Sequence, residues 1–261
     1  MSSVVATWTK QLHVDTLAEN LGVVCPAALN PAADLLLLGL EVHTTRADST
    51  GRILAVGLVS GFSSHNRLVV LKHRSVLFRA DEADIRGSRL PSDVAEDSGV
   101  GTSDETLEMV ATRLIEENAL YGVDAAKGFA YLQAVLADAA ADGTILCGQT
   151  LTSFALPRLE SYGCLGSRYP RLLDTGMLIK SACIPTRAVD ATAYEFYLRV
   201  AHRAVAGVRY SIPGFVLPVM FGDTGVPPSV IRVIDARSRV EWYAELSLHA
   251  FQRVREEALR A

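Results

Sequence analysis

The sequence predicts an α/β protein whose core is a mixed sheet, with three antiparallel strands followed by parallel strands, flanked by helices. Two features predict this fold. Three apolar runs with short connections come first, and segments of helical periodicity then alternate with short apolar runs. The 261 residues are 49% apolar and 21% charged, which is the balance of a globular chain and not of a disordered one.

The first half of the sheet is an antiparallel meander in this interpretation. Its strands are predicted over residues 35–42, 53–60 and 68–73. The first strand is a continuous apolar run that reaches a carboxylate, Glu41, near its end, as expected of a strand covered on both faces. Residues 47–51 have the composition of a turn, and the short connections favour antiparallel pairing.

The chain divides into an N-terminal arm and one domain. The arm covers residues 1–33 and contains a short helix over 9–20, and the domain covers residues 34–261. Within the domain, residues 80–103 are acidic and rich in Ser, Gly and Asp, with no sustained period. This composition predicts a surface loop.

The second half of the domain alternates helices with short strands. A helix begins at Ser103, and a second one covers residues 125–141 and ends at Asp142-Gly143. The remaining elements are expected in this order: a strand over 144–147, a helix over 154–162, a strand over 172–175, a helix over 191–205, a loop over 213–228 and a helix over 240–259.

Charge and cysteine content restrict the function classes. The net charge of −4 gives no global attraction to polyanions, so binding to nucleic acid would need a local basic patch. The apolar runs are too short to span a bilayer, and no secretory or transit signal is recognisable, so we expect an intracellular protein without a membrane partner. The cysteines form no CxxC pair and are expected to be buried free thiols: Cys25, Cys147, Cys164 and Cys183.

Residues 145–159 carry the most specific motif. They resemble the second exonuclease motif of the DnaQ-like (DEDD) 3′–5′ exonuclease superfamily, in the form found in family B DNA polymerases, I-x-x-G-Y-N-I-x-N-F-D-L-P-Y-L. The identical positions are Ile145, Gly148, Phe154, Leu156, Pro157 and Leu159. The positions that differ in kind are Gln149 for the aromatic residue, Thr150 and Ser153 for the two asparagines, and Ala155 for the metal-binding aspartate.

The other two motifs of this superfamily resemble segments on either side. Its first motif is an apolar strand ending in D-x-E, and here Gly39 replaces the first acid while Glu41 keeps the second. Its third motif, in the form Y-x-x-x-D, falls on residues 243–247, with Ser247 in place of the aspartate. An H-x-x-x-x-D reading starting at His202 also ends without an acid, at Gly207.

The resemblance implies a ribonuclease H-like fold and, in intact members, two divalent metals held by four carboxylates. Gly39 and Ala155 offer no side-chain oxygen, and Ser247 offers only a neutral one, so we expect no metal cofactor and no catalysis. An ordinary structural role is an alternative for two of these residues. Gly39 can permit close approach of another backbone, and Ala155 is a common residue at the start of a helix.

Several polar residues are weaker candidates, each with a structural alternative. His43 is expected either to contact a phosphate or a metal or to be an ordinary polar residue at a strand end. Asp174 is expected either to be a surviving metal ligand or to cap the following segment. His202 is expected in the core or at its boundary, and Glu241 and Glu245 are expected to be solvated. A group of arginines near the second motif either contacts a phosphate backbone or forms a solvated face: Arg158, Arg168 and Arg171.

Three hypotheses for function follow. The first is a non-catalytic exonuclease-like domain that binds protein partners in a nucleic-acid-processing assembly, and single-stranded nucleic acid as a further partner. The second is an active 3′–5′ exonuclease that binds Mg²⁺ or Mn²⁺ through relocated ligands. Those ligands would be Glu41, Asp174, Asp190 or Asp235. The third is a structural protein whose cleft is filled by apolar side chains.

Overall fold

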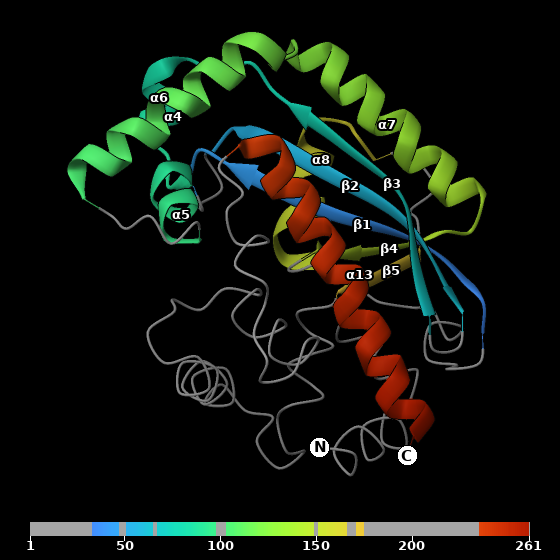
Figure 1. The fold of residues 1–261 in the computed structure, drawn as a ribbon. Coiled ribbons are helices and arrows are strands. Elements are labelled where there is room, and N and C mark those ends of the chain that lie inside the picture. The colour runs from blue at the N-terminus through green and yellow to red at the C-terminus, as the bar shows by residue number, and fades with distance from the viewer. Residues whose placement is uncertain are drawn as a thin grey trace, which may run out of the picture.

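A five-stranded mixed sheet forms the centre of the protein in a computed structural model (Figure 1). The structure describes residues 33–46, 51–64, 67–97, 103–148, 151–165, 171–174 and 235–260. The strands are β1 (Leu35–Thr44), β2 (Ile53–Ser64), β3 (Arg67–Leu77), β4 (Ile145–Gly148) and β5 (Arg171–Asp174). Their order is β3-β2-β1-β4-β5, with β1, β2 and β3 antiparallel and β4 and β5 parallel to β1. The predicted fold class is confirmed, and the arrangement is consistent with a ribonuclease H-like fold.

The position of each strand in the sheet explains its composition. β1 and β2 have a neighbour on both sides and helices on both faces, and their apolar residues are almost all buried. β3 lies at the edge, and Leu71, Lys72 and His73 in its middle are exposed. All three strands extend beyond the predicted ranges, because Ser63 and Ser64 of β2 and Val76 and Leu77 of β3 also pair, as does Thr44 of β1.

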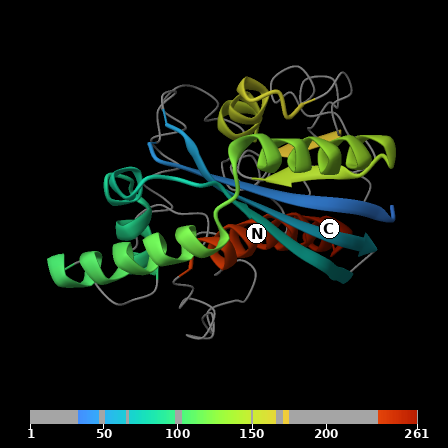
Figure 2. The ribbon, with the colours of Figure 1, turned by 90° about the horizontal axis from the view of Figure 1, so that it is seen from above.

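Helices cover both faces of the sheet (Figures 1 and 2). α13 (Ala236–Arg260) lies across one face, whereas α7 (Ala125–Ala141) and α8 (Leu156–Ser161) lie on the opposite face. The odd-numbered residues of β1, including Leu35 and Leu37, pack with α13, and the even-numbered ones pack with the α7–α8 side. Each face therefore has its own hydrophobic cluster.

Three helices at one end of the sheet enclose a third hydrophobic cluster together with the start of α13. They are α4 (Glu82–Arg86), α5 (Leu90–Asp97) and α6 (Asp104–Tyr121). The surface loop predicted over residues 80–103 is therefore wrong for residues 82–97. Leu90 and Val94, one helical turn apart, are buried in this cluster, but helices of five and eight residues are too short to show a sustained period.

Local signals fix the boundaries of the long helices. The Ser103 hydroxyl accepts a hydrogen bond from the Thr106 amide at 3.3 Å and caps α6, as the sequence predicts. α7 ends where Gly143 takes a positive φ of 68°, a conformation that glycine adopts without strain. Before α8, one turn of π-helix covers Leu151–Ala155. α13 begins four residues before the predicted start, at Ala236.

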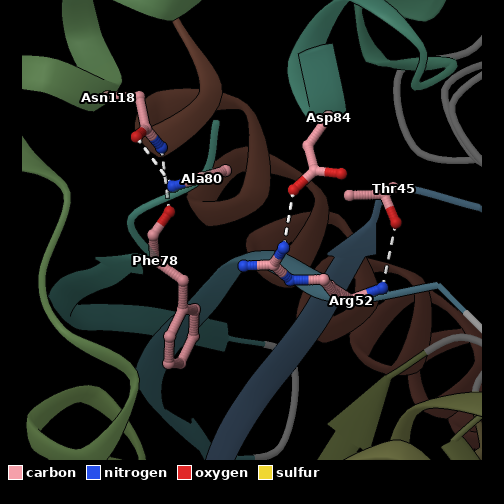
Figure 3. Close-up of polar contacts among 6 residues, drawn as sticks. All are labelled: Thr45, Arg52, Phe78, Ala80, Asp84 and Asn118. Atoms are coloured by element: carbon pink, nitrogen blue, oxygen red, sulfur yellow. Dashed lines mark hydrogen bonds and ion pairs between the residues drawn. The ribbon is translucent and has the colours of Figure 1, made fainter. Parts of the chain in front are cut away.

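Polar contacts attach α4 and α6 to the strands (Figure 3). The buried Asn118 side chain of α6 donates to the Phe78 carbonyl at 2.8 Å and accepts from the Ala80 amide at 3.0 Å. It thus satisfies two backbone groups at the point where β3 has ended. Arg52, at the start of β2, forms an ion pair with Asp84 of α4 at 2.8 Å.

Four predicted segments lie outside the described residues, apart from Ala33 and Gly51: the arm with its helix over 9–20, the turn over 47–51, the helix over 191–205 and the loop over 213–228. None of the helices in the described part of the chain combines the length and apolar character needed to cross a bilayer.

Candidate functional site

Gly39, which the sequence resemblance aligns with the first acid of the exonuclease motif, lies directly beneath the backbone of α13. A Cβ atom at this position would overlap the Ala244 carbonyl oxygen and lie 2.9 Å from its carbonyl carbon. Gly57 on β2 has the same relation to α13, because a Cβ there would overlap the Val240 carbonyl and lie 2.7 Å from the Glu241 amide nitrogen. The glycines therefore permit close approach of another backbone, and the structural alternative for Gly39 is confirmed.

We call this pair of positions, together with Gly61, the glycine furrow. In the register of β1 and β2, Gly57 lies opposite Glu41 and Gly61 lies opposite Leu37, so the furrow runs obliquely across both strands. A Cβ on Gly61 would meet the side-chain ends of Leu248 and Leu68 at 3.0 and 3.3 Å. α13 thus meets the furrow through residues four apart, which share one side of a helix.

Glu41, which the sequence resemblance aligns with the second acid of the first exonuclease motif, belongs to a largely buried polar cluster between β1 and α13. The cluster consists of Glu41 and His43 on β1 with Arg239 and Tyr243 on α13. The Glu41 Oε1 atom lies 3.6 Å from the His43 Nε2 atom, and their side chains are only 17% and 16% exposed. Arg239 Nη2 donates to the Tyr243 hydroxyl at 3.1 Å, and the His43 ring meets the Tyr243 ring edge-on at 5.8 Å.

Burial controls the protonation of both β1 side chains. Loss of solvation raises the pKa of Glu41 to about 8, although the positive charge of Arg239 opposes the shift. Loss of solvation, reinforced by Arg239, lowers the pKa of His43 to about 3. At pH 7 Glu41 is therefore mostly a neutral acid and His43 is a neutral imidazole, whose Nδ1 atom has no hydrogen-bond partner among the described residues. Arg239 is the charged member of the cluster.

This arrangement does not fit a divalent metal. A magnesium ion needs oxygen ligands and prefers charged ones, but the carboxyl group of Glu41 is mostly protonated at pH 7 and lies near the positive charge of Arg239. An aspartate at position 39 would collide with α13. Among the residues that the structure describes, no three His, Cys, Asp or Glu side chains are grouped as a metal site.

The two other motif positions are also filled by packing. Ala155 is 3% exposed and belongs to the hydrophobic cluster of the α7–α8 face, opposite the face that Gly39 presents to α13. Ser247 is 1% exposed, and its hydroxyl donates to the Tyr243 carbonyl of its own helix at 3.3 Å. The structure therefore brings Glu41 close to Tyr243, the first residue of the segment 243–247, but leaves Ala155 in the core on the opposite face.

The predicted phosphate contacts stay predictions. Arg158 is half-buried, with its guanidinium carbon 5.9 Å from the centre of the Phe154 ring, and Arg171 is exposed at the start of β5. Arg168 lies outside the described residues. For Asp174 the structure gives only the backbone, which pairs with Gly148. Asp190 and His202 also lie outside the described part.

The acidic residues of α13 form specific contacts. Asp235 accepts a hydrogen bond from the Ser238 amide at 2.7 Å, so it caps the start of the helix. Glu241 accepts from the Ser75 hydroxyl at 2.5 Å, and Glu245 lies 2.7 Å from the Nε2 atom of His73. The prediction that Glu241 and Glu245 are solvated holds only in part, because both are half-buried and α13 lies close enough to β3 for both to form contacts with it.

Hydrogen bonds also change the acidity of one of these groups. Contacts from His249 and then His73 lower the pKa of Glu245 despite its partial burial. Both histidines lie within 3.2 Å of its carboxylate. Of the four cysteines, Cys147 and Cys164 are buried free thiols, as predicted, and the other two lie outside the description.

Sequence reasoning missed Arg239 and Gly57. Arg239 lies just before the predicted start of the last helix at residue 240, and nothing in the pattern indicates that this arginine is only 4% exposed and shares one side of α13 with Tyr243. Gly57 lies inside a predicted strand, where an isolated glycine is a signal for close approach of a backbone. Comparison of the chain with protein-family models, with curated proteins and with solved structures gave no match.

Proposed function

We propose that this protein is a non-catalytic domain of the exonuclease-like type, which acts as a binding or scaffold domain in a nucleic-acid-processing assembly. The observation that carries the proposal is the contact between Gly39 and α13. At the position where the resembling exonucleases carry their first metal-binding aspartate, the Ala244 carbonyl leaves no space even for a methyl group.

The state of Glu41 supports the same proposal. Two-metal hydrolysis of a phosphodiester depends on carboxylates that are ionised and converge on the ions. Here the pKa of the single remaining acid is raised to about 8 by burial, and its charged neighbour is Arg239. The polar cluster consequently stabilises the docking of α13 on β1 in this proposal and does not hold a metal.

The charge of the chain favours protein over nucleic acid as the main partner. With a net charge of −4, long-range attraction to a phosphate backbone is absent. The arginines near residues 145–159 supply a local site for single-stranded nucleic acid, and such binding would weaken steeply with added salt.

A nuclease assay tests the proposal. The full chain is incubated with end-labelled single-stranded DNA and RNA in Mg²⁺ or Mn²⁺, alongside Glu41→Gln and the exposed-site control Glu116→Gln. We expect no release of nucleotides above a no-protein blank from any of the three. Release that Glu41→Gln abolishes and Glu116→Gln preserves would overturn the proposal in favour of an active exonuclease with relocated ligands.

A purely structural role is the second candidate. It is favoured by the burial of all three substituted motif positions, since Ala155 and Ser247 are 3% and 1% exposed and Gly39 is covered by α13. Measured binding separates the two candidates: a binding domain has a saturable partner, whereas a purely structural protein has none.

A further inference from the structure

A pocket lies at the outer edge of the sheet, and none of the four residues of the polar cluster around Glu41 lines it. It has a volume of about 310 Å³ and is formed where the end of β3 meets the end of α6, the start of α7 and the start of α13. Its principal lining residues are Ser75, Tyr121, Val123, Lys127, Tyr131 and Arg237.

Large apolar side chains are exposed around this pocket. Tyr121, Val123 and Tyr131 line it and are 54%, 37% and 43% exposed, and the neighbouring Leu120 is 75% exposed. They make up half of the large hydrophobic residues that are exposed in the described part of the chain. A concentration of exposed tyrosine and aliphatic surface is typical of a protein interface.

The charged groups that line the pocket are positive. Lys127 is exposed at the start of α7, and the Arg237 guanidinium carbon lies 4.6 Å from the centre of the Tyr121 ring. The Arg237 Nε atom also donates to the Ser75 hydroxyl at 3.3 Å, which fixes the guanidinium beside the pocket. Arginine held against an aromatic ring keeps free donors for an incoming carboxylate.

The acidic groups near the pocket already have partners. Glu117 accepts from the backbone amides of Ala236 and Arg237 at 2.7 and 3.1 Å. Asp124 forms an ion pair with Arg79 at 2.9 Å. Glu241 accepts from the Ser75 hydroxyl. The pocket is thus an apolar surface with two cationic groups at its wall.

We propose that this pocket binds a peptide segment of a protein partner in which acidic residues alternate with aromatic or aliphatic ones. The apolar side chain would pack between Tyr121 and Tyr131, and the acidic ones would pair with Lys127 and Arg237. This inference rests on the proposed role as a binding domain and names the partner's chemistry. The enrichment of tyrosine and arginine matches the residues that dominate binding energy in protein interfaces.

Charge and geometry favour a peptide over single-stranded nucleic acid. A nucleic-acid groove needs a row of cations that follows successive phosphates, together with open aromatic faces on which bases stack. Here two cations lie at one pocket, and Arg237 already covers one face of Tyr121.

Fluorescence anisotropy with a defined probe tests the proposal. The probe is a fluorescein-labelled decapeptide, Gly-Ser-Glu-Phe-Asp-Leu-Glu-Phe-Gly-Ser, and its matched control carries Gln and Asn in place of Glu and Asp. A labelled oligo-dT strand is the third ligand. The full chain is compared with Lys127→Glu and Tyr131→Ala, and with Arg113→Glu and Met109→Ala as controls at exposed positions on α6.

We expect saturable binding of the acidic peptide, weakened at least roughly fivefold in the amide peptide and roughly tenfold by Lys127→Glu. Tyr131→Ala should weaken it by roughly fivefold or more, and both α6 controls should change it less than about twofold. Circular dichroism confirms that each variant is folded.

Three results would overturn the proposal: no binding of the acidic peptide up to roughly 1 mM, equal binding of the amide peptide, or binding that Lys127→Glu leaves unchanged. Oligo-dT binding that Lys127→Glu removes, without peptide binding, would assign the pocket to nucleic acid instead. The nuclease assay is independent, so failure of the peptide test leaves the absence of catalysis untouched.

Discussion

The glycine furrow makes a quantitative prediction about the stability of the protein. Replacing Gly39 by alanine places a methyl group against the Ala244 backbone, 2.9 Å from the carbonyl carbon, whereas ordinary contact begins at 3.4 Å. Because the obstructing atoms are backbone, they move only if α13 moves as a unit. Such a movement also loosens the packing of Leu248, which is fully buried.

The expected loss follows from two opposing effects. Overpacking of a dense core costs about 1–3 kcal/mol, and rigid backbone places this site at the upper end. Replacing glycine by alanine also lowers the conformational entropy of the unfolded chain, which stabilises the folded protein by about 0.4–1 kcal/mol. Gly39→Ala should therefore destabilise the protein by about 2 kcal/mol, and Gly57→Ala by at least as much, because its Cβ meets three backbone atoms of α13.

Gly61→Ala is the matched control. It lies on the same face of the sheet, but its Cβ meets the methyl ends of Leu248 and Leu68, which adjust by small rotations. We expect a change below about 1 kcal/mol. The free energy of unfolding of all three variants is measured by urea denaturation at one pH.

The order of the three variants decides the outcome. Gly39→Ala as stable as the native chain, or Gly61→Ala as damaging as Gly39→Ala, would contradict the close approach of α13. A fourth variant, Gly39→Asp, tests whether a carboxylate at this position creates a metal site. It should be less stable still and should not gain Mn²⁺ binding by electron paramagnetic resonance, because the introduced side chain collides with the Ala244 backbone and displaces α13.

Three further predictions concern buried polar groups. Stability should be level between about pH 4.5 and 6.5, since Glu41 binds its proton more tightly when folded (pKa raised to about 8) and His43 binds it less tightly (lowered to about 3), so their effects cancel there. It should fall by about 1.4 kcal/mol per pH unit from pH 6.5 to 8, where Glu41 is ionised in the unfolded chain but still protonated in the folded protein. It should fall similarly from pH 4.5 to 3, where His43 is protonated in the unfolded chain but still neutral in the folded protein. Glu41→Gln should remove the alkaline fall in urea titrations. Asn118→Ala should cost about 2–4 kcal/mol in the same assay, because two backbone groups at the end of β3 lose their partners. Glu117→Ala should cost about 1–2 kcal/mol, since it accepts from two amides at the start of α13, and the exposed Glu116→Ala should be neutral in thermal unfolding.

The sheet and the long helices could be predicted because their signals are local. An apolar run identifies β1, and residues 125–141 repeat apolar side chains at helical spacing until Gly143 ends the helix. The helices within 82–97 were not predicted, because they are short and contain few apolar residues. Those residues become buried only through packing against α6. Tertiary packing, and not local preference, determines those elements.

The site was predictable only in outline. The apolar run predicted a strand that carries Glu41 near its end, and the resemblance drew attention to Gly39, Ala155 and Ser247, but neither could give the protonation of Glu41. That property depends on burial beneath α13 and on Arg239, which is brought to β1 from a distant part of the chain. The same limit applies to the pocket, whose residues come from four elements.

The long-range docking of α13 has a consequence for how the protein is made. The buried hydrogen bond from Ser63 to Gln252 joins residues 189 apart in sequence, and the furrow depends on the same helix. During synthesis on the ribosome, one apolar face of β1 and β2 therefore stays without its α13 partner while some 170 further residues emerge. At usual rates of synthesis this takes roughly ten to thirty seconds. Folding of that face is then a late event with high contact order. A nascent chain stalled before α13 should be recognised by chaperones or proteases through the exposed apolar face of β1 and β2 that α13 covers in the folded protein.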